Sequence, residues 1–560
     1  MSTATLPMYR WDDLPWKKFR KVVWKLQKRI YQAMLRGDVK LVRKLQKLLM
    51  KSRAAKFLAV RRVAQENSGK KTAGVDGVKP LTPSQRLRMA LSLGVYSKAR
   101  PVRRVWIEKY GSDELRPLGI PVMRERAQES LVKEALEPEW EARFEANSYG
   151  FRPGRSCHDA IDAIFKAISL KAKFALDADI AKCFDRIDHT ALLAKVNASP
   201  PVQRQLKAWL KAGVMDGGEL FPTEAGTMQG GTVSPLLANI ALHGLETAIV
   251  SSFPRQKGLT LSVVRYADDF VVLHADRRVV EECAVIAQDW LRPMRLELKA
   301  SKTRIAHTLE EIDGRAGFDF LGFNIRQYKV GRTKSAKNTN GKQLGFKTII
   351  KPSDKAIRKH VQSLRQTIDN HRGVTQTQLI SALNRTIDGW ARYYSTVVSG
   401  KVFSKLSDSL FQMLWRWAKR RHPNKGKKWV ANRYWGVDQG QGWNFQSPGR
   451  PRLRKHVHTA IRRHVKVKGK RTPFDGDWVY WSIRRGHSPD VSPRVAKLLK
   501  KQRGVCIECG LYFRDGDQME VSYINPRRSR WRGATFNLLL VHQRCQEALC
   551  ADLAPLNGYA

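Results

Sequence analysis

Leu261-Ser-Val-Val-Arg-Tyr-Ala-Asp-Asp-Phe-Val-Val-Leu-His274 is the stretch of this chain that decides the fold. Two β-rich runs flank a short acidic segment, and this pattern predicts a hairpin with Asp268 and Asp269 at its tip. Two adjacent carboxylates between apolar strands repel each other and resist burial unless a cation lies between them. Taken alone, an Asp-rich turn without a metal is the simpler interpretation, so other segments must decide.

The charge of the chain indicates the class of its partner. Its 560 residues include 103 Lys and Arg against 50 Asp and Glu, a net charge of +53. Such an excess along nearly the whole length points to a large polyanion rather than one acidic ligand. A membrane surface is the alternative, but no apolar run approaches the roughly 20 residues of a spanning helix. The first residues have no basic segment followed by an apolar one, so we expect no signal peptide. We expect a cytoplasmic nucleic-acid-binding protein with several domains and no membrane partner.

A second acidic segment lies upstream, in Phe174-Ala-Leu-Asp-Ala-Asp179. The apolar residues predict a strand that ends at Asp179, and a carboxylate there would share cations with the acidic hairpin if the strands are neighbours. Two metal ions in such a cluster activate a 3′-hydroxyl and stabilise the leaving pyrophosphate. Between the two segments lies Gln229-Gly-Gly231, followed by Ser234-Pro235. The glycines let the backbone approach a ligand closely, and Ser-Pro suits a helix start.

The order of these segments resembles the reverse-transcriptase family, specifically the group II intron-encoded reverse transcriptase/maturase. The resemblance covers roughly residues 60–420 closely and implies an α+β multidomain fold with right-hand-like fingers and palm and a helical thumb. The matching motifs, in chain order, are Arg116-Pro-Leu-Gly-Ile-Pro121, Ser148-Tyr-Gly-Phe-Arg-Pro-Gly-Arg155, Asp179-Ile180, Gln229-Gly-Gly231 with Ser234-Pro235, Tyr266-Ala-Asp-Asp269, Leu298-Lys-Ala-Ser-Lys-Thr303 and Phe318-Asp-Phe-Leu-Gly-Phe323.

The resemblance implies a polymerase site with two Mg²⁺ ions. Asp179 and Asp268 would be the main ligands, Asp269 would complete the acidic cluster, and Ile180 would contribute a further ligand. For three nearby acids we expect structural roles in turns and hydrogen bonds instead; these are Asp177, Asp185 and Asp188.

The resemblance also implies a nucleotide pocket. Phe184 matches the aromatic residue that excludes a 2′-hydroxyl and so selects deoxynucleotides. Lys302 is a candidate acid toward pyrophosphate, and a structural role for it is equally open. The implied nucleotide-binding residues are Phe184, Gln229, Gly231, Arg116, Arg124 and Lys302.

Helical patterns flank the polymerase region on both sides. Trp16 to Ser52 has apolar residues at helical spacing, and Gly37 divides it into two helices. Ser353 caps a helix that ends near Gly373, and two more follow over about 376–394 and 403–420. The resemblance identifies the latter group as the thumb, or maturase, domain. Residues there that would contact the template-primer or intron RNA are Arg385, Trp390 and Arg392.

Two cysteine-containing pairs near the end of the chain predict a zinc site. Cys506-Ile-Glu-Cys509 and His542-Gln-Arg-Cys545 have the spacing of one tetrahedral Zn²⁺ with three thiolates and an imidazole. Buried cysteines in a helical hairpin are the alternative.

The surroundings of this site resemble the His-Asn-His endonuclease domain that often ends these proteins. Where that family has its Asp-His pair, this chain has Ser522-Tyr523, and Gln546 stands in place of a later histidine. A phenol with a pKa of about 10 is a poor general base near neutrality. We therefore expect a folded zinc domain of ββα type that does not cut DNA.

These observations predict an RNA-directed DNA polymerase and maturase that binds group II intron RNA, assists its splicing and reverse-transcribes it during retrohoming. Its partners would be the intron RNA, target DNA, a template-primer duplex and dNTPs. A splicing-only maturase without polymerase activity is the alternative, which the intact aspartates disfavour. The expected domains are an RNA-binding helical extension (1–70), fingers and palm (71–350), thumb (351–425), a basic DNA-binding region (426–503) and the zinc domain (504–560).

Overall fold

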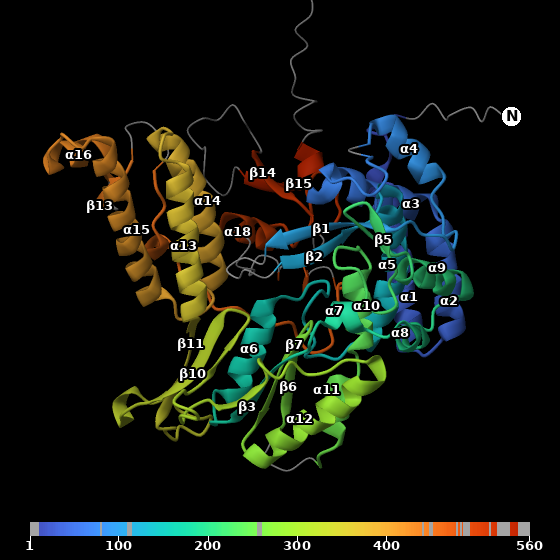
Figure 1. Cartoon of the computed structure of the whole chain (residues 1–560), viewed down its shortest axis with the longest axis horizontal. Helices are drawn as coiled ribbons and strands as arrows, with labels where there is room; N and C mark the ends of the chain where they lie inside the picture. Colours follow the sequence, from blue (N-terminus) through green and yellow to red (C-terminus); the bar gives the residue numbers. More distant parts are fainter. Residues whose placement is uncertain are drawn as a thin grey trace, which may run out of the picture.

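A computed structural model shows a chain of mixed helices and sheets (Figure 1). Within the described part of the chain, every helix is too short or too polar to span a lipid bilayer. The structure describes residues 10–78, 81–108, 115–254, 260–438, 442–446, 452–477, 480–481, 484, 493–513, 517–523 and 538–546.

The first helices form a unit packed against the long helix α5 (Met123–Arg143). The predicted break at Gly37 is confirmed: its φ of 74° ends one helix, and Asp38 caps the next by accepting from the Leu41 amide. Apolar side chains from the helices, among them Ile30 and Phe57, share one core with α5. The helices of this unit are α1 (Trp16–Leu35), α2 (Val39–Lys51), α3 (Arg53–Arg61) and α4 (Pro83–Leu91).

An antiparallel sheet in the order β6-β7-β3-β8 forms the centre of the molecule. Its strands are β3 (Phe174–Asp179), β6 (Ser262–Tyr266), β7 (Asp269–His274) and β8 (Arg304–His307). Alternate residues of β7 face opposite sides, so Phe270 and Val272 pack toward α12 (Arg277–Leu291), whereas Val271 and Leu273 pack toward α6 (Cys157–Ile168). Burial on both faces explains why these strands are almost continuously apolar.

The β6–β7 hairpin predicted from the sequence is present, but its turn lies one residue earlier than expected, because Asp269 is the first residue of β7. Tyr266 pairs with Asp269, which leaves Ala267 and Asp268 as a two-residue turn, and Ala267 has the positive φ that such turns use. The shorter elements beside the sheet are α7 (Cys183–Arg186), α8 (His189–Val196), α9 (Pro200–Leu210), α10 (Ser234–Ala241) and α11 (Leu245–Ser251). The helix start expected at Ser234-Pro235 is therefore also confirmed.

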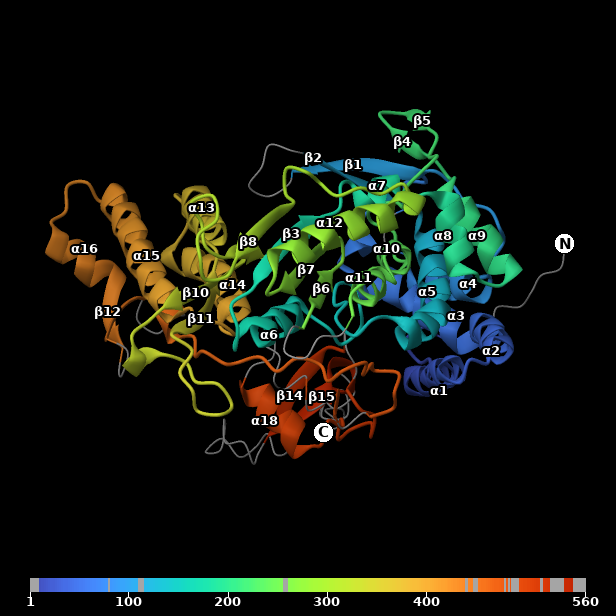
Figure 2. The same ribbon diagram turned by 90° about the horizontal axis from the view of Figure 1, so that it is seen from below.

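A second sheet, in the order β2-β1-β4-β5, lies beyond α7 and α10 (Figure 2). Its strands are β1 (Val102–Glu108), β2 (Leu115–Ile120), β4 (Val214–Asp216) and β5 (Glu219–Phe221). The sequence analysis did not identify β1 and β2. The sheet depends on a long-range pairing of β1 with β4, which joins Val102 to Val214.

A three-stranded sheet leads from the central sheet to a helical bundle. Its strands are β9 (Phe318–Phe320), β10 (Phe323–Lys329) and β11 (Phe346–Pro352), and the polar segment between the last two is the connection of a hairpin. The bundle contains α13 (Asp354–Asn370), α14 (Gln376–Tyr394) and α15 (Gly400–Arg421). All three helices match their predicted ranges, and Ser353 accepts from the Ala356 amide as the expected cap.

After the bundle, α16 (Lys427–Tyr434) and a hairpin of β12 (Trp435–Asp438) and β13 (Gly442–Phe445) precede a segment that returns along α6 (Figure 2). This return segment, residues 452–484 where described, is fastened by Asp159, the buried first-turn acid of α6. Asp159 accepts from His464 (3.1 Å), from the Val467 amide (2.8 Å) and from Arg484.

The last unit contains α18 (Pro493–Lys501), β14 (Met519–Tyr523) and β15 (Leu538–His542), with the two strands antiparallel. Residues 547–560 of the predicted zinc domain lie outside the described residues.

Candidate functional site

Three aspartates meet where strands of the central sheet end. Asp179 is the last residue of β3 and lies directly opposite Asp269, the first residue of β7. Asp268 lies in the turn between β6 and β7, and its carbonyl accepts from the Ile180 amide at 3.3 Å. The two acidic segments that were 90 residues apart in the sequence are therefore neighbours in space.

Burial and mutual repulsion dominate the electrostatics of this cluster. Burial raises the pKa of Asp268, and the nearby charge of Asp179 adds to the shift. Burial also raises the pKa of Asp269 to about 7, with further contributions from the carboxylates of Asp268 and Asp179. Carboxylate oxygens are the donors that hard divalent cations prefer. The cluster therefore fits Mg²⁺, because a cation would remove the repulsion that these shifts express.

Lys302 supplies positive charge to the same cluster. Its Nζ lies 2.6 Å from Asp179 Oδ2, and about half of the side chain is exposed. Partial burial opposes its charged form, but the hydrogen bond to Asp179 prevails and raises the pKa of Lys302. The ammonium group thus remains protonated beside the aspartates. Its role toward pyrophosphate stays a prediction.

A cavity of about 310 Å³ lies between the second sheet and the segment that carries Gln229. Phe184, Arg104 and Gln229 contribute to its lining. Gln229 Nε2 donates to Asp185 Oδ1 at 3.0 Å, and the Gln229 carbonyl accepts from the Gly119 amide of β2 at 2.7 Å. Hydrogen bonds of Gln229, which is predicted to bind the nucleotide, thus connect its segment to both the second sheet and α7.

Glu129 of α5 binds the residues that follow Gln229-Gly-Gly231. The sequence analysis did not identify Glu129. Its carboxylate accepts from the amides of Thr232 and Val233, directly after Gly231. Glu129 is completely buried, and this burial raises its pKa to about 7. No local pattern distinguishes it from the other glutamates of α5, so only the tertiary structure identifies it.

The two arginines that are predicted to bind the nucleotide, Arg116 and Arg124, lie in different surroundings. Arg116 is on β2, and its positive charge offsets a small part of the rise that burial causes in the pKa of Asp268. Arg124 instead donates to the Ser92 carbonyl at 2.8 Å and lies over the Tyr96 ring at 5.6 Å. Contact of either residue with a triphosphate stays a prediction.

The structural roles expected for the neighbouring acids agree with their contacts. Asp188 caps α8 by accepting from the Ala191 amide at 2.8 Å. Asp177 lies 3.6 Å from Arg304, and Asp185 accepts from Gln229.

The residues predicted to touch RNA lie on α14. Arg385 and Arg392 are exposed, and Arg392 lies 3.7 Å from Asp388. Trp390 is half-buried and stacks on the His360 ring with 4.5 Å between centroids. Trp390 therefore also has a packing role, and RNA contact by the three residues stays a prediction.

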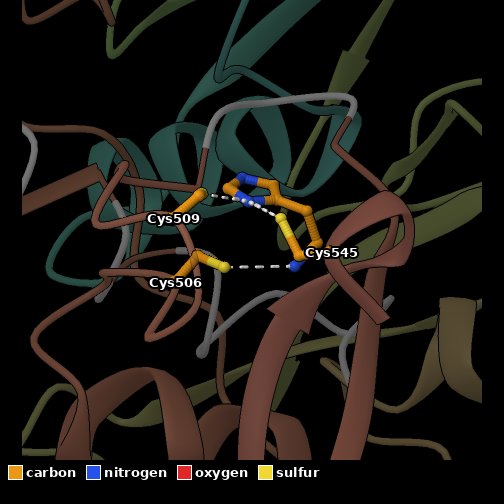
Figure 3. Close-up of side chains that lie close together, drawn as sticks. Cys506, Cys509 and Cys545 are labelled. Carbon is orange, nitrogen blue, oxygen red and sulfur yellow. Dashed lines mark hydrogen bonds between the residues drawn. The ribbon is translucent and has the colours of Figure 1, made fainter. Parts of the chain in front are cut away.

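The four predicted zinc ligands converge in the last unit (Figure 3). Among the described residues, they form the only group of three or more Cys, His, Asp or Glu side chains whose ligand atoms all lie within 4.8 Å of one another. The members of this group are Cys506, Cys509, His542 and Cys545. Three sulfurs and one imidazole nitrogen at this separation fit a tetrahedral Zn²⁺ site.

The metal-ligand group is linked to the beginning of the chain. Asp517 Oδ1 accepts from Arg20 of α1 at 3.3 Å, and Arg544, the residue before Cys545, pairs with Glu66. Tyr523 ends β14 with 40% of its surface exposed, and its correspondence to a nuclease general base stays a prediction.

Comparisons with known proteins match three parts of the chain to family models. Residues 107–325 match "Reverse transcriptase (RNA-dependent DNA polymerase)", residues 11–93 match "N-terminal domain of reverse transcriptase", and residues 357–435 match "Group II intron, maturase-specific domain".

Individual relatives agree with these family models. Group II intron-encoded protein LtrA of Lactococcus lactis subsp. cremoris is 27% identical over 386 residues, which is 55% of this chain and 63% of LtrA. Protein YkfC of Escherichia coli (strain K12) is 31% identical over 327 residues, which is 50% of this chain and 83% of YkfC. The chain thus spans somewhat less than two thirds of LtrA.

Proposed function

This chain belongs to the group II intron-encoded reverse transcriptase/maturase family, and on that premise we propose that it is an RNA-directed DNA polymerase that also binds group II intron RNA and assists its splicing. The polymerase activity is proposed from one observation. Asp179 of β3 lies opposite Asp269 of β7, and Asp268 lies beside them in the β6–β7 turn. Copying of the intron RNA during retrohoming is part of the same proposal.

The aspartates would hold two Mg²⁺ ions, with Asp179 and Asp268 as the main ligands and Ile180 as a further one. When bound, the ions supply activation of the primer 3′-hydroxyl and neutralise charge on the leaving pyrophosphate. The protein orients the nucleotide: Gln229 and Gly231 line its pocket, and the Phe184 ring occupies the space that a 2′-hydroxyl needs. Arg116, Arg124 and Lys302 would face the triphosphate, where fixed cations favour its negative charge.

The maturase activity rests on a different surface. The match of residues 357–435 to the maturase-specific domain supports intron RNA as a partner. The exposed Arg385 and Arg392, together with the basic N-terminal helices, would contact phosphates, which gives affinity without base specificity. The right-hand-like architecture follows from this assignment, with fingers and palm before the helical thumb of α13 to α15. Because intron RNA, template-primer duplex, dNTPs and target DNA are its proposed partners, we expect the protein to act in the cytoplasm.

We assign Zn²⁺ to the last unit as a structural ion held by the four converging side chains. Tyr523 and Gln546 stand where a His-Asn-His nuclease needs histidines, which supports a domain that does not cut DNA. Target DNA would then be contacted by residues 426–503 without cleavage by this chain.

Primer extension on an annealed RNA template with dNTPs and Mg²⁺ tests the proposal. We expect extension by the wild type and by Asp289→Ala, which removes an exposed acid of α12, and none by Asp268→Ala. Well-folded wild-type protein that binds intron RNA but extends no primer would favour the splicing-only maturase.

A further inference from the structure

The segment from Ser148 to Arg152 is fixed against the turn that carries Asp268. The Tyr149 amide donates to the Arg265 carbonyl at 2.9 Å, and Asn239 of α10 donates to the Gly150 carbonyl at 2.7 Å. A Cβ atom on Gly150 would overlap the backbone nitrogen of Ala267. The segment and the acidic turn are thus in direct backbone contact, which only a glycine permits.

Arg152 anchors the other end of the segment. It is 4% exposed and makes two hydrogen bonds to the Glu141 carboxylate, at 2.8 Å and 2.9 Å. Its Nη1 also donates to the carbonyls of Glu145 and Ser148, at 2.7 Å each. A buried two-point arginine–carboxylate pair of this kind fixes geometry as well as charge.

Phe151 is the exception within this buried segment. It is 48% exposed between Gly150 and Arg152, and its φ of 58° lies in the left-handed region that bulky residues rarely adopt. Strained residues in over-determined surroundings cluster at functional sites. Because its neighbours make the hydrogen bonds that hold the segment, the exposed ring contributes little to the stability of the fold.

The Phe151 ring contacts Phe184. The two ring centroids are 6.1 Å apart with an interplanar angle of 84°, an edge-to-face pair. Phe184 lies on α7, which is only four residues long and follows Lys182 at a positive φ. Within the described part of the chain, Phe151 is the one aromatic side chain in contact with the Phe184 ring. Phe184 is half-buried and also packs against the core around the central sheet, and the contact with Phe151 further limits how far its ring can turn away.

We propose that Phe151 is a positioning residue for sugar selection, which holds the Phe184 ring against the ribose of the incoming nucleotide. The inference rests on the proposed polymerase function and deepens it. Removal of the Phe151 ring would let Phe184 move aside and admit a 2′-hydroxyl. Discrimination between a deoxyribose and a ribose would depend on the contact between the Phe184 ring and the sugar. A single contact of this kind changes the ratio of the two kcat/KM values by roughly tenfold or more.

The test is single-nucleotide incorporation with a dNTP and the matching rNTP, giving kcat and KM for each. We expect Phe151→Ala and Phe151→Leu to lower the dNTP/rNTP selectivity at least about tenfold, chiefly through a lower KM for the rNTP. Phe151→Tyr, which keeps the ring, should retain wild-type selectivity. Phe165→Ala removes another exposed phenylalanine, 40% exposed, from α6 and serves as the matched control.

The outcomes separate this inference from the one on which it rests. Wild-type protein that incorporates no dNTP overturns the proposed polymerase, and this inference with it. Folded Phe151→Ala and Phe151→Leu proteins that polymerise with unchanged selectivity overturn the role of Phe151 alone. If one of the two variants fails to fold, the other decides.

Discussion

Asp517 Oδ2 lies 3.2 Å from Nε2 of His542, whereas the sulfur of Cys509 lies 3.2 Å from the other ring nitrogen of the same histidine. A carboxylate behind a ligating imidazole fixes the orientation of the ring and strengthens it as a ligand. Asp517 also accepts from Arg20, so one side chain connects the metal-ligand group to the first helix of the chain.

Asp517→Asn should therefore weaken zinc binding by roughly 10- to 100-fold. The amide keeps the shape of the side chain but loses the charge that orients His542 and pairs with Arg20. Competition with a coloured zinc chelator measures the affinity. Glu520→Gln, at an exposed position of β14, should match the wild type. Equal zinc affinity of Asp517→Asn and the wild type would contradict the role of Asp517 in orienting His542.

Gly150→Ala should lower the rate of primer extension by on the order of 100-fold while the protein stays folded. The added methyl group overlaps the backbone at Ala267, so the turn that carries Asp268 must shift. A displacement of about 1 Å at reacting groups costs on the order of 100-fold in rate. Gly389→Ala is the control, because a Cβ there meets no atom within 4 Å. Full activity of Gly150→Ala, measured by primer extension, would mean that the contact does not position the acidic turn.

Arg152→Met should lower the free energy of unfolding by about 3–5 kcal/mol, because it leaves Glu141 charged, buried and unpaired. Both side chains of this pair are 1% exposed. The surface pair between Lys166 and Asp162 is the comparison, and Lys166→Ala should change stability by less than about 1 kcal/mol. Chemical denaturation of both variants measures the difference, and similar losses would contradict the importance of burial.

Glu129→Gln should raise stability at high pH but not at low pH. Burial raises the pKa of Glu129 from 4.5 to about 7 in the folded state. Between these pH values the folded protein holds a proton that the unfolded chain releases, so the free energy of unfolding falls as pH rises. Above pH 7 the ionised carboxylate costs about 3 kcal/mol. Glutamine keeps the accepting oxygen and avoids this loss.

Denaturation at pH 4 and pH 8 measures the effect of this substitution. We expect Glu129→Gln and the wild type to have equal stability at the lower pH, and the variant to be more stable at the higher pH. Glu281→Gln, which changes an exposed acid of α12, should leave both values unchanged. A constant difference between Glu129→Gln and the wild type at both pH values would assign the effect to packing rather than to ionisation.

Local sequence patterns predicted the elements whose causes are local. The β6–β7 hairpin, the cap at Ser353 and the break at Gly37 each depend on a few adjacent residues, and each was predicted, although the hairpin turn lies one residue earlier than expected. The spacing of the cysteines also predicted which four side chains would converge. In these cases the sequence carries the whole physical cause.

Contacts between distant segments could not be predicted in the same way. The strands around Val102 and Val214 pair across more than a hundred residues, and no local pattern indicates which distant strand is the partner. Glu129 belongs to a helix with several buried glutamates, and only its contact with the amides after Gly231 distinguishes it. Burial and partner choice decided these positions, and neither is a property of the local sequence.

The ion pair between Arg20 and Asp517 joins residues 497 positions apart. During synthesis, the first helices therefore leave the ribosome long before the segment that contacts them exists. Because the entropy of closing a loop rises only with the logarithm of its length, the separation costs little once both segments are present. It instead fixes an order: the last unit can dock on the first helix only after Asp517 has been synthesised, and a chain that stops before Asp517 never makes this contact.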